Sequence, residues 1–346
     1  MIKVFDTFAD EVVSAWRRLE DFPDVSVFQS LVWCQSAWET LLAPTGKNRL
    51  YLMLWTGAGN ESPVVMPTFL DRRGTLRFIN DSNSDHGEAI YVHGVNRHYA
   101  FKEIVEAIKA DRGIRSVCLQ KFQRESEALG YLSVFLGNSL LYRDHAYSCL
   151  DIPHAQDLAS GQKHLCHDDR NRIACCQRKV ASIPVAICSA RAGLPFPEAQ
   201  LAALREAMRT NGWRGEGFLG ANMMRFMRSI YERGICDVIS MGDGDVPIAM
   251  AVRLRQRGKV HCWLMLYQNP KWNTYLNVLY FGALALEGDF TVDLGVGIYE
   301  YKMKPFRPKL ECTFSLRWGR GLFAQIYAFL RMNWRFIRVA WGCRRR

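Results

Sequence analysis

KVHCWLMLYQNPKWNTYLNVLYFGALALEGDFTVDLGV, at residues 259–296, is the stretch that decides the fold. Short apolar runs bounded by Gly, Asn and Pro are typical of strands, whereas the longer apolar run between them is typical of a buried helix. Together with two apolar runs just before it, the stretch predicts strands at 236–241, 247–255 and 259–267, a helix at 274–288 and a strand at 290–296. A helix between two strands permits them to pair in parallel, so we expect one parallel pair here.

The rest of the chain repeats this order. The first half predicts strands at 2–5, 49–55, 63–70, 75–80, 88–92 and 115–120, with helices at 6–20, 30–42 and 98–110, the second capped by Ser30. The second half begins with a strand at 148–152, a basic helix at 159–181, a strand at 182–190 and helices at 196–212 and 220–234. Each half runs strand, helices, meander, helix, strand. The order predicts an α+β class with two similar domains, each a mixed, mostly antiparallel sheet flanked by helices.

Composition and charge placement separate the body of the chain from its end. The chain has 346 residues, 49% of them hydrophobic, which is enough for two cores. The net charge is +11, and residues 302–346 hold 12 bases and one acid, so the remainder is formally neutral. That asymmetry argues against a nucleic-acid-binding body and indicates a surface-binding tail. Eleven irregularly spaced cysteines, an acidic N-terminal stretch and apolar runs too short to span a bilayer predict a cytoplasmic protein.

The tail at 319–346 predicts a basic amphipathic helix. Arg331, Arg335 and Arg338 fall on one helical face, with apolar side chains opposite them and tryptophans between. The basic stripe includes Arg317, Arg320 and Arg345 if the helix extends that far. We expect this helix to bind an anionic membrane surface on the inner face of the membrane. The alternatives are that its apolar face packs on the C-terminal domain or binds a partner protein.

Four segments in order resemble the CelD-like (cellulose-biosynthesis-type) acetyltransferase branch of the GNAT superfamily. They are VFQSLVWCQSAWETLL from 27, SNSDHG from 82, HDDRNRIACCQRKV from 167, and the block from 211 that ends in VDLGVGIYEYKMKPF. The resemblance implies two GNAT-like domains, at 1–150 and 151–318, and acyl transfer from acetyl-CoA. One departure is clear: NPKWNTYLNVL stands where the family has a small-Pro-Gly turn, and the Gly-rich phosphate loop is missing.

The resemblance puts the acyl-CoA site at the helix start after the 259–267 strand. Free N–H groups at a helix N-terminus bind phosphate, which makes the candidates Asn273, Thr274, Tyr275, Leu276 and Asn277. Asn273 or Thr274 is equally interpreted as an ordinary helix N-cap.

The catalytic candidates follow the last strand of the block. Asp293 stands before two glycines and suits a base or an acceptor-orienting group, or is simply a turn aspartate. Tyr301 suits protonation of the leaving thiolate, and Lys302 suits binding of a phosphate or carboxylate. The alternation around them is equally typical of a plain strand with one polar face.

Two further clusters of polar residues are candidate sites. Asp85 and His86, in the loop that the resemblance places near the cleft, are candidate substrate-binding residues, or part of an ordinary polar loop. A zinc site would need converging ligands, but the histidines and cysteines of 164–176 lack the paired spacing of zinc ligands. We therefore predict no metal.

These features predict an acetyl-CoA-dependent N- or O-acetyltransferase that acts on a sugar or surface-polysaccharide precursor. The substrate rests on the resemblance alone. One alternative is a Fem-type aminoacyl transferase, which also pairs two GNAT-like domains. The other is a non-catalytic accessory protein of a membrane-associated polysaccharide synthesis complex, which the altered turn at 269–275 favours.

Overall fold

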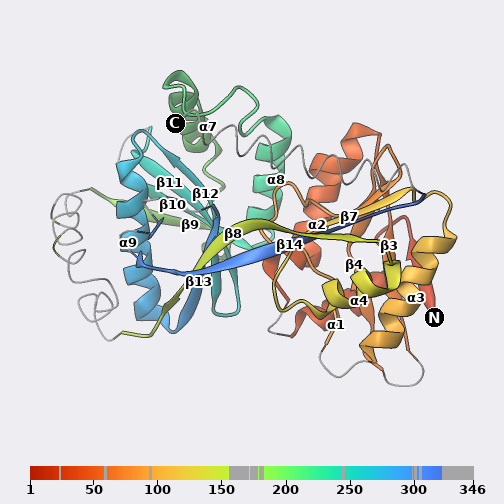
Figure 1. Ribbon diagram of the computed structural model, residues 1–346. Helices are drawn as coiled ribbons and strands as arrows, with labels where there is room; N and C mark the ends of the chain where they lie inside the picture. The colour runs from red at the N-terminus through yellow and green to blue at the C-terminus, as the bar shows by residue number, and fades with distance from the viewer. Residues whose placement is uncertain are drawn as a thin grey trace, which may run out of the picture. The chain divides into compact units, whose positions relative to one another are not determined.

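The structure is a computed structural model. It describes residues 1–22, 25–57, 61–92, 96–155, 171, 178, 183–242, 246–297, 299, 302–303 and 306–321. These residues form two compact units, unit 1 at 1–145 with the segment from 312 onward, and unit 2 at 146–311. The chain passes from unit 1 to unit 2 within one long strand and returns within another (Figure 1). The domain limits expected from the sequence, 1–150, 151–318 and 319–346, stay a prediction.

Unit 1 combines a small antiparallel sheet with part of a larger one. The small sheet has the order β1-β3-β4. The larger sheet runs in the order β2-β5-β6-β7-β14, followed by the first half of β8. The strands are β1 (Ile2–Phe5), β2 (Arg49–Leu50), β3 (Leu52–Trp55), β4 (Val64–Met66), β5 (Thr68–Leu70), β6 (Thr75–Phe78), β7 (Ser116–Phe122), β8 (Leu140–Ile152) and β14 (Lys309–Gly319). The last strand, drawn in blue, lies beside the yellow β7 although the two are far apart in sequence (Figure 1).

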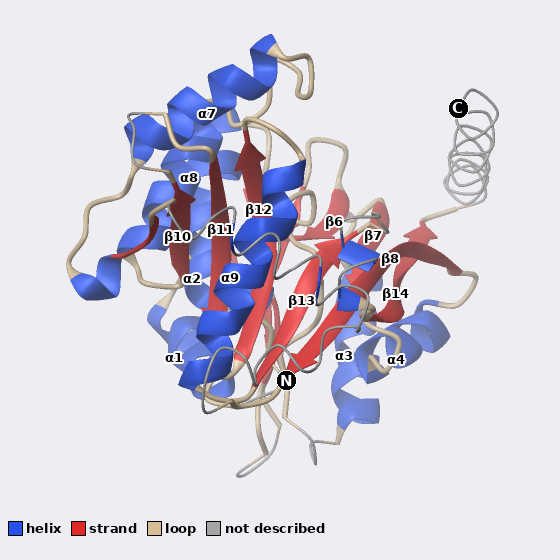
Figure 2. Cartoon of the chain, turned by 90° about the vertical axis from the view of Figure 1, so that its left-hand side faces the viewer, coloured by secondary structure: helices blue, strands red, loops and turns tan. Residues whose placement is uncertain are grey.

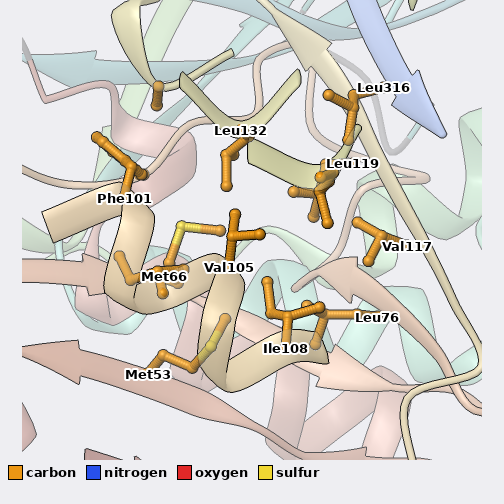
Figure 3. Packing of buried hydrophobic residues seen from close by; sticks show 14 of the residues in the cluster. Met53, Met66, Leu76, Phe101, Val105, Ile108, Val117, Leu119, Leu132 and Leu316 are labelled. Atoms are coloured by element: carbon orange, nitrogen blue, oxygen red, sulfur yellow. The ribbon is translucent and has the colours of Figure 1, made fainter. Parts of the chain in front are cut away.

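The helices of unit 1 bury their apolar faces on these sheets. They are α1 (Asp10–Glu20), the 3-10 turn η1 (Val27–Gln29), α2 (Leu31–Ala37), the π turn η2 (Trp38–Leu42), the 3-10 turn η3 (Ala43–Thr45), α3 (Arg97–Ala110) and α4 (Glu127–Leu136). Ser30 caps α2, as predicted, by accepting a hydrogen bond from the N–H of Trp33 at 3.2 Å. Figure 3 shows the core in which Phe101, Val105 and Ile108 of α3 meet strand residues such as Met66 and Leu119.

Unit 2 is a six-stranded mixed sheet with helices on both sides. Its order is the second half of β8, then β13-β12-β11-β10-β9. Helix α9 lies across the front of the sheet in Figure 2 and contacts β11 and β12, while α8 lies behind and contacts β10. The elements are β9 (Val185–Ser189), the 3-10 turn η4 (Ala190–Ala192), α7 (Glu198–Thr210), α8 (Ala221–Glu232), β10 (Cys236–Met241), β11 (Ala249–Gln256), β12 (Lys259–Tyr267), α9 (Lys271–Glu287) and β13 (Phe290–Val296).

One parallel strand pair forms across a helix in each unit, and the pair in unit 2 is the one predicted from the sequence. In unit 1, β6 pairs in parallel with β7 across α3, and in unit 2, β12 pairs in parallel with β13 across α9. The other pairs of known register are antiparallel. The predicted α+β class with mixed, mostly antiparallel sheets flanked by helices is therefore confirmed.

Three local predictions differ from the structure. Residues 88–92 form only an isolated bridge, Val65 to Ile90, and no strand. Helix α4 and strand β14 were not predicted. Arg317 lies within β14, where its Nε donates to the Tyr142 hydroxyl at 2.9 Å, so the basic helical stripe does not reach it. Residues 322–346, which carry the rest of the predicted tail helix, lie outside the described residues.

Candidate active site

The parallel pair β12–β13 opens after three residue pairs. Its register runs from Lys259↔Thr291 to His261↔Asp293, although β12 continues to Tyr267 and β13 to Val296. Beyond the last pair, the backbone N–H and C=O groups on the facing edges of the two strands are not paired with one another. Such an edge can accept an extended, amide-containing chain in the manner of an added strand. We call this opening the fork.

His261 and Asp293 stand at the vertex of the fork. Both side chains are almost fully buried, with 6% and 5% of their surface exposed. The imidazole Nδ1 lies 3.3 Å from Asp293 Oδ2, while Asp293 Oδ1 accepts a hydrogen bond from the N–H of Gly295 at 2.7 Å. A carboxylate fixed by the backbone on one oxygen and facing an imidazole with the other orients the ring. The pair is therefore suited to proton transfer at the fork.

The two glycines of the DLGVG segment are needed for its backbone conformation. Gly295 has φ +77° and Gly297 has φ +99°, values that residues with a side chain rarely adopt. A Cβ at Gly297 would also lie 2.5 Å from the ring of Tyr299. The bend shifts the β13–β8 register between Asp293 and Val296, and pairing resumes where Val296 meets Tyr147.

Lys302 supports the same bend. Its side chain is 6% exposed, and Nζ donates to the carbonyl oxygens of Gly295 and Val296 at 3.3 Å each. The ammonium also lies 5.1 Å from the ring centroid of Tyr299. These contacts give Lys302 a part in holding the glycine bend, beside the ligand-binding role predicted for it. Tyr301, the predicted acid, lies outside the described residues.

Strand β8 places two further groups beside β13, and both stay protonated. Burial and a 2.5 Å hydrogen bond to Glu311 raise the pKa of Tyr147, and the same bond lowers the pKa of Glu311. Cys149 is the register partner of Asp293, and burial followed by the charge of Asp293 raises the pKa of its thiol. A thiol kept protonated is a poor nucleophile, which argues against a covalent cysteine intermediate here.

The start of α9 differs from the predicted phosphate site. The helix begins at Lys271, so Asn273 and Thr274 lie inside its first turn, and the N-cap interpretation of them is wrong. The N–H groups of the first three residues are already bonded, to Asn269 Oδ1 at 3.1 Å, Asn269 O at 3.1 Å and Pro270 O at 3.2 Å. Few free N–H groups therefore remain at this end for a phosphate.

Most of the predicted donor-binding residues on α9 face the core. Asn273, Leu276 and Asn277 are buried, whereas Thr274 and Tyr275 are half-buried. Asn277 Oδ1 accepts a hydrogen bond from the guanidinium of Arg253, a residue of β11 with no exposed surface. Among the residues that the structure describes, Asn273 Oδ1 has no hydrogen-bond partner. The buried face of α9 is thus polar at its beginning, which sequence periodicity did not indicate.

In unit 1, the predicted substrate-binding loop packs against the strands of its own unit. His86 is 3% exposed, and its carbonyl accepts a hydrogen bond from Gln29 Nε2 at 3.0 Å. Asp85 is half-buried. Gly87 donates to the carbonyl of Lys121 at 2.9 Å, and a Cβ there would lie 2.3 Å from the carbonyl oxygen of Gln120. The loop therefore occupies the space beside β7 just beyond the parallel pair of unit 1.

His261 is the site residue that sequence analysis missed. The only signal was a histidine within an otherwise apolar strand, KVHCWLMLY. Its partner Asp293 was predicted, but the parallel register that joins the two could not be derived from the sequence. The histidines and cysteines of 164–176, considered for zinc, lie outside the described residues.

Part of the chain matches a known protein family. Residues 170–303 match the family model described as the acetyltransferase (GNAT) domain. Unit 2 therefore carries a GNAT-type domain. The matched range includes the fork and α9 of this GNAT-type unit, and no curated protein matches the chain.

Solved structures show the same fold over most of the chain. The C-terminal domain of a protein named as a lysylphosphatidylglycerol synthetase from Agrobacterium fabrum has a TM-score of 0.55 at 12% identity, covering 92% of this chain and 94% of that one. FemX has a TM-score of 0.56 at 9% identity, covering 92% and 97%. L-PGS from Bacillus licheniformis has a TM-score of 0.50 at 14% identity, covering 83% and 86%. At these identities the likeness shows the fold alone.

Proposed function

We propose that the protein transfers an acetyl group from acetyl-CoA to an amino or hydroxyl group of a sugar or surface-polysaccharide precursor. The observation that carries the acyl-transfer part is the fork of the GNAT-type unit, with the buried His261–Asp293 pair at its vertex. The open strand edges suit the amide-containing arm of the donor, which would run between them as an added strand. The sugar acceptor rests on the CelD-like resemblance.

The pair supplies the proton chemistry that acyl transfer needs. His261 takes the proton from the acceptor as its nitrogen or oxygen bonds to the thioester carbon, and Asp293 orients the ring. The carbon–sulfur bond then breaks, and the thiolate takes a proton from an acid, the role predicted for Tyr301. Lys302 maintains the glycine bend that holds Asp293.

The test is release of free thiol from acetyl-CoA in the presence of a panel of amino sugars and polysaccharide precursors. We expect His261→Gln and Asp293→Asn to lower kcat by about 10²- to 10⁴-fold. The matched control is His145→Gln, since His145 lies 3.3 Å from Asp144 in a similar pair on β8 of unit 1. Full activity in both fork variants, or no thiol release with any acceptor, would overturn the proposal.

Aminoacyl transfer is the second candidate. One structural neighbour is named as a putative lysylphosphatidylglycerol synthetase and another as L-PGS, and FemX resembles the chain over 92% of its length. The same histidine–aspartate pair serves an ester donor, because the proton movements are alike. A charged tRNA in place of acetyl-CoA separates the two: transfer of the amino acid, without thiol release from acetyl-CoA, would favour this candidate. An accessory protein would use neither donor.

The basic tail is proposed to hold the protein reversibly on an anionic membrane surface. The support is the sequence alone, in which residues 302–346 hold 12 bases and one acid. None of the helices in the described part of the chain combines the length and apolar character needed to cross a bilayer. Since Gly319 ends β14 and Arg320 binds carbonyls of α3 and the turn after it, the test truncation belongs after Gly321. Equal binding of the full and truncated chains to anionic liposomes would refute the role.

A further inference from the structure

Helix α4 of unit 1 turns an uncharged side to solvent. Its buried residues are Ala128, Leu129, Leu132 and Leu136. Leu132 faces Val105 of α3 in the core (Figure 3). Val134, two residues further on, lies on the opposite side of the helix. It has 73% of its surface exposed, the largest fraction among the large apolar side chains described.

The uncharged surface continues past the helix. Residues 128–142, which run through the rest of α4 into the start of β8, contain no charged side chain. Ser139 Oγ donates to the carbonyl of Ser133 at 3.0 Å, which holds the chain before β8 against the helix. Leu141, two residues after Ser139, is 48% exposed. The neighbouring helix α3, by contrast, exposes two lysines and a glutamate, Lys102, Lys109 and Glu106.

Aromatic rings border Val134 on the side of α3. The Tyr131 ring stacks on that of Phe101 with centroids 5.8 Å apart, and the Phe135 ring lies 4.9 Å from that of the exposed His98. Tyr131 and Phe135 pack against the core but remain only half-buried. Such rings beside an aliphatic side chain favour the boundary between lipid headgroups and acyl chains.

Four residues together make up what we call the apolar face of α4. They are Tyr131, Val134, Phe135 and Leu141. A surface helix of a globular protein normally turns charged residues to solvent, so an uncharged outer side indicates a partner.

The described chain ends beside the same helix. Arg320 donates to the carbonyl of Lys109 at 2.9 Å, and Lys109 Nζ donates to the carbonyl of Phe135, in the last turn of α4, at 2.7 Å. The residues that follow Gly321, 322–346, hold six arginines and no acid. They begin next to the apolar face, so an anionic surface that binds them also comes near this face.

The size of the apolar face favours a lipid surface over a protein partner. Helix α4 has ten residues and is therefore about 15 Å long. One side of so short a helix falls well below the ~800 Å² that each partner buries in a stable protein complex. Shallow insertion of apolar side chains needs no such area, because arginines nearby add attraction to anionic headgroups.

We propose that the apolar face of α4 lies on an anionic lipid surface, with Val134 and Leu141 inserted below the headgroups. The tail then supplies electrostatic attraction and α4 supplies apolar burial. Two weak contacts of different kinds give stable but reversible attachment. The lipid as partner rests on the membrane role proposed for the tail, whereas the exposed face itself does not.

The experiment is co-sedimentation of the full chain with vesicles of equal parts phosphatidylcholine and phosphatidylglycerol. We expect Val134→Glu to weaken binding by about 10- to 100-fold, because apolar burial is lost and a carboxylate faces an anionic surface. Val134→Leu should bind at least as tightly as the wild type. Leu286→Glu is the matched control and should bind normally, since Leu286 is a 42% exposed apolar residue of helix α9 in unit 2. Circular dichroism checks that each variant is folded.

A photoactivatable phosphatidylglycerol in the same vesicles reports the contact directly. Peptides from residues 127–142 should carry the label, and its absence from them overturns the proposal. Normal binding of Val134→Glu, in a protein whose binding needs the tail, refutes the apolar face alone. A Val134→Glu effect in a protein that binds equally well after truncation at Gly321 refutes the role of the tail alone.

Two other occupants of the apolar face would also overturn the proposal. Without vesicles, faster hydrogen exchange of α4 peptides in the truncated chain than in the full chain would assign the face to the tail. A dimer of the full chain that Val134→Glu dissociates would assign it to a second copy.

Discussion

Arg253 gives the sharpest stability prediction, because its charge is buried without an acid. The guanidinium has no exposed surface, and it donates to Asn277 Oδ1, the Met265 sulfur at 2.8 Å and the Leu264 carbonyl at 3.5 Å. Its Cζ also lies 5.8 Å from the ring centroid of Tyr280. Its Nε has no hydrogen-bond partner, and no ion pair with a carboxylate occurs among the described residues. Burying a charge costs several kcal/mol unless an anion and hydrogen bonds compensate for it. We therefore expect Arg253 to destabilise unit 2 relative to an apolar side chain of similar size.

The magnitude follows from a double-mutant cycle with Asn277. Asn277→Leu alone removes the side-chain acceptor of a buried cation and should lower the free energy of unfolding by about 1.5–3 kcal/mol. Arg253→Met alone removes the buried charge but leaves Asn277 Oδ1 without its hydrogen-bond donor. The two effects on the free energy of unfolding offset each other to within about 1 kcal/mol. The double variant removes both the donor and the acceptor, so neither group is left buried without a partner. We expect its free energy of unfolding to exceed that of the wild type by about 1–4 kcal/mol.

The assay is urea unfolding of the full chain, followed by amide hydrogen exchange in peptides from β11 and α9. These peptides report unit 2 by itself. Arg255→Met is the matched control on the same strand, since Arg255 is paired with Glu287 at 2.6 Å and Asp237 at 3.6 Å. The Arg255→Met variant should be less stable than the wild type or equally stable. A double variant more than about 1 kcal/mol less stable than the wild type would refute the reasoning and show that Arg253 is compensated.

Three further outcomes are expected. Gly297→Ala should lower activity and stability, because the added Cβ would lie 2.5 Å from the Tyr299 ring. The control is Gly130→Ala, at a position with open space on α4, which should stabilise the chain by about 0.5–1 kcal/mol in thermal unfolding. Burial raises the pKa of Glu88 to about 8, so the unfolded chain releases its proton first and wild-type stability should fall as pH rises from about 4.5 to 8. A Glu88→Gln variant should show a flatter profile in unfolding measured across that range, and equal profiles would contradict the burial. Arg320→Ala should lower the free energy of unfolding by about 1–3 kcal/mol, against no change for the exposed Arg72→Ala, because Arg320 donates to four carbonyl groups, those of Ile108, Lys109, Asp111 and Ile114.

The sequence predicted the local elements of unit 2 well, because each is a long run with one clear period. The strands at 236–241, 247–255 and 259–267 and the helix after them lie within a few residues of β10, β11, β12 and α9. The boundary error at the start of α9 came from Asn269, whose side chain caps the helix from two residues before Lys271. Because Pro270 stands between Asn269 and the helix, the sequence pattern did not identify Asn269 as the capping residue.

Strand β14 was missed although its signal was present. Leu310, Cys312, Phe314, Leu316 and Trp318 alternate strictly with polar residues, the period of a half-buried strand. The stretch was assigned instead to a motif ending and a basic tail. Its partners, β7 and β8, lie far away in the sequence, and a long-range pairing of this kind leaves no local mark. The pairing of His261 with Asp293 was not predicted for the same reason, since only the parallel register brings the two residues together.

The two parallel strand pairs among the described residues differ in what covers the strands beyond the pair. This difference bears on where an acyl donor binds. In unit 1, the loop after β6 covers the strands just past the pair, with Gly87 against the Phe78 ring and the Gln120 carbonyl. Lys121 holds that loop by donating to the carbonyl of Asp81 at 2.9 Å, at the cost of a left-handed backbone with φ +66°. In unit 2, the helix α9 returns directly to β13, and the register of the pair ends at His261 and Asp293. Because a loop with a strained backbone covers the parallel pair of unit 1, whereas the pair of unit 2 ends at a histidine and an aspartate, we expect a single donor to bind, in unit 2.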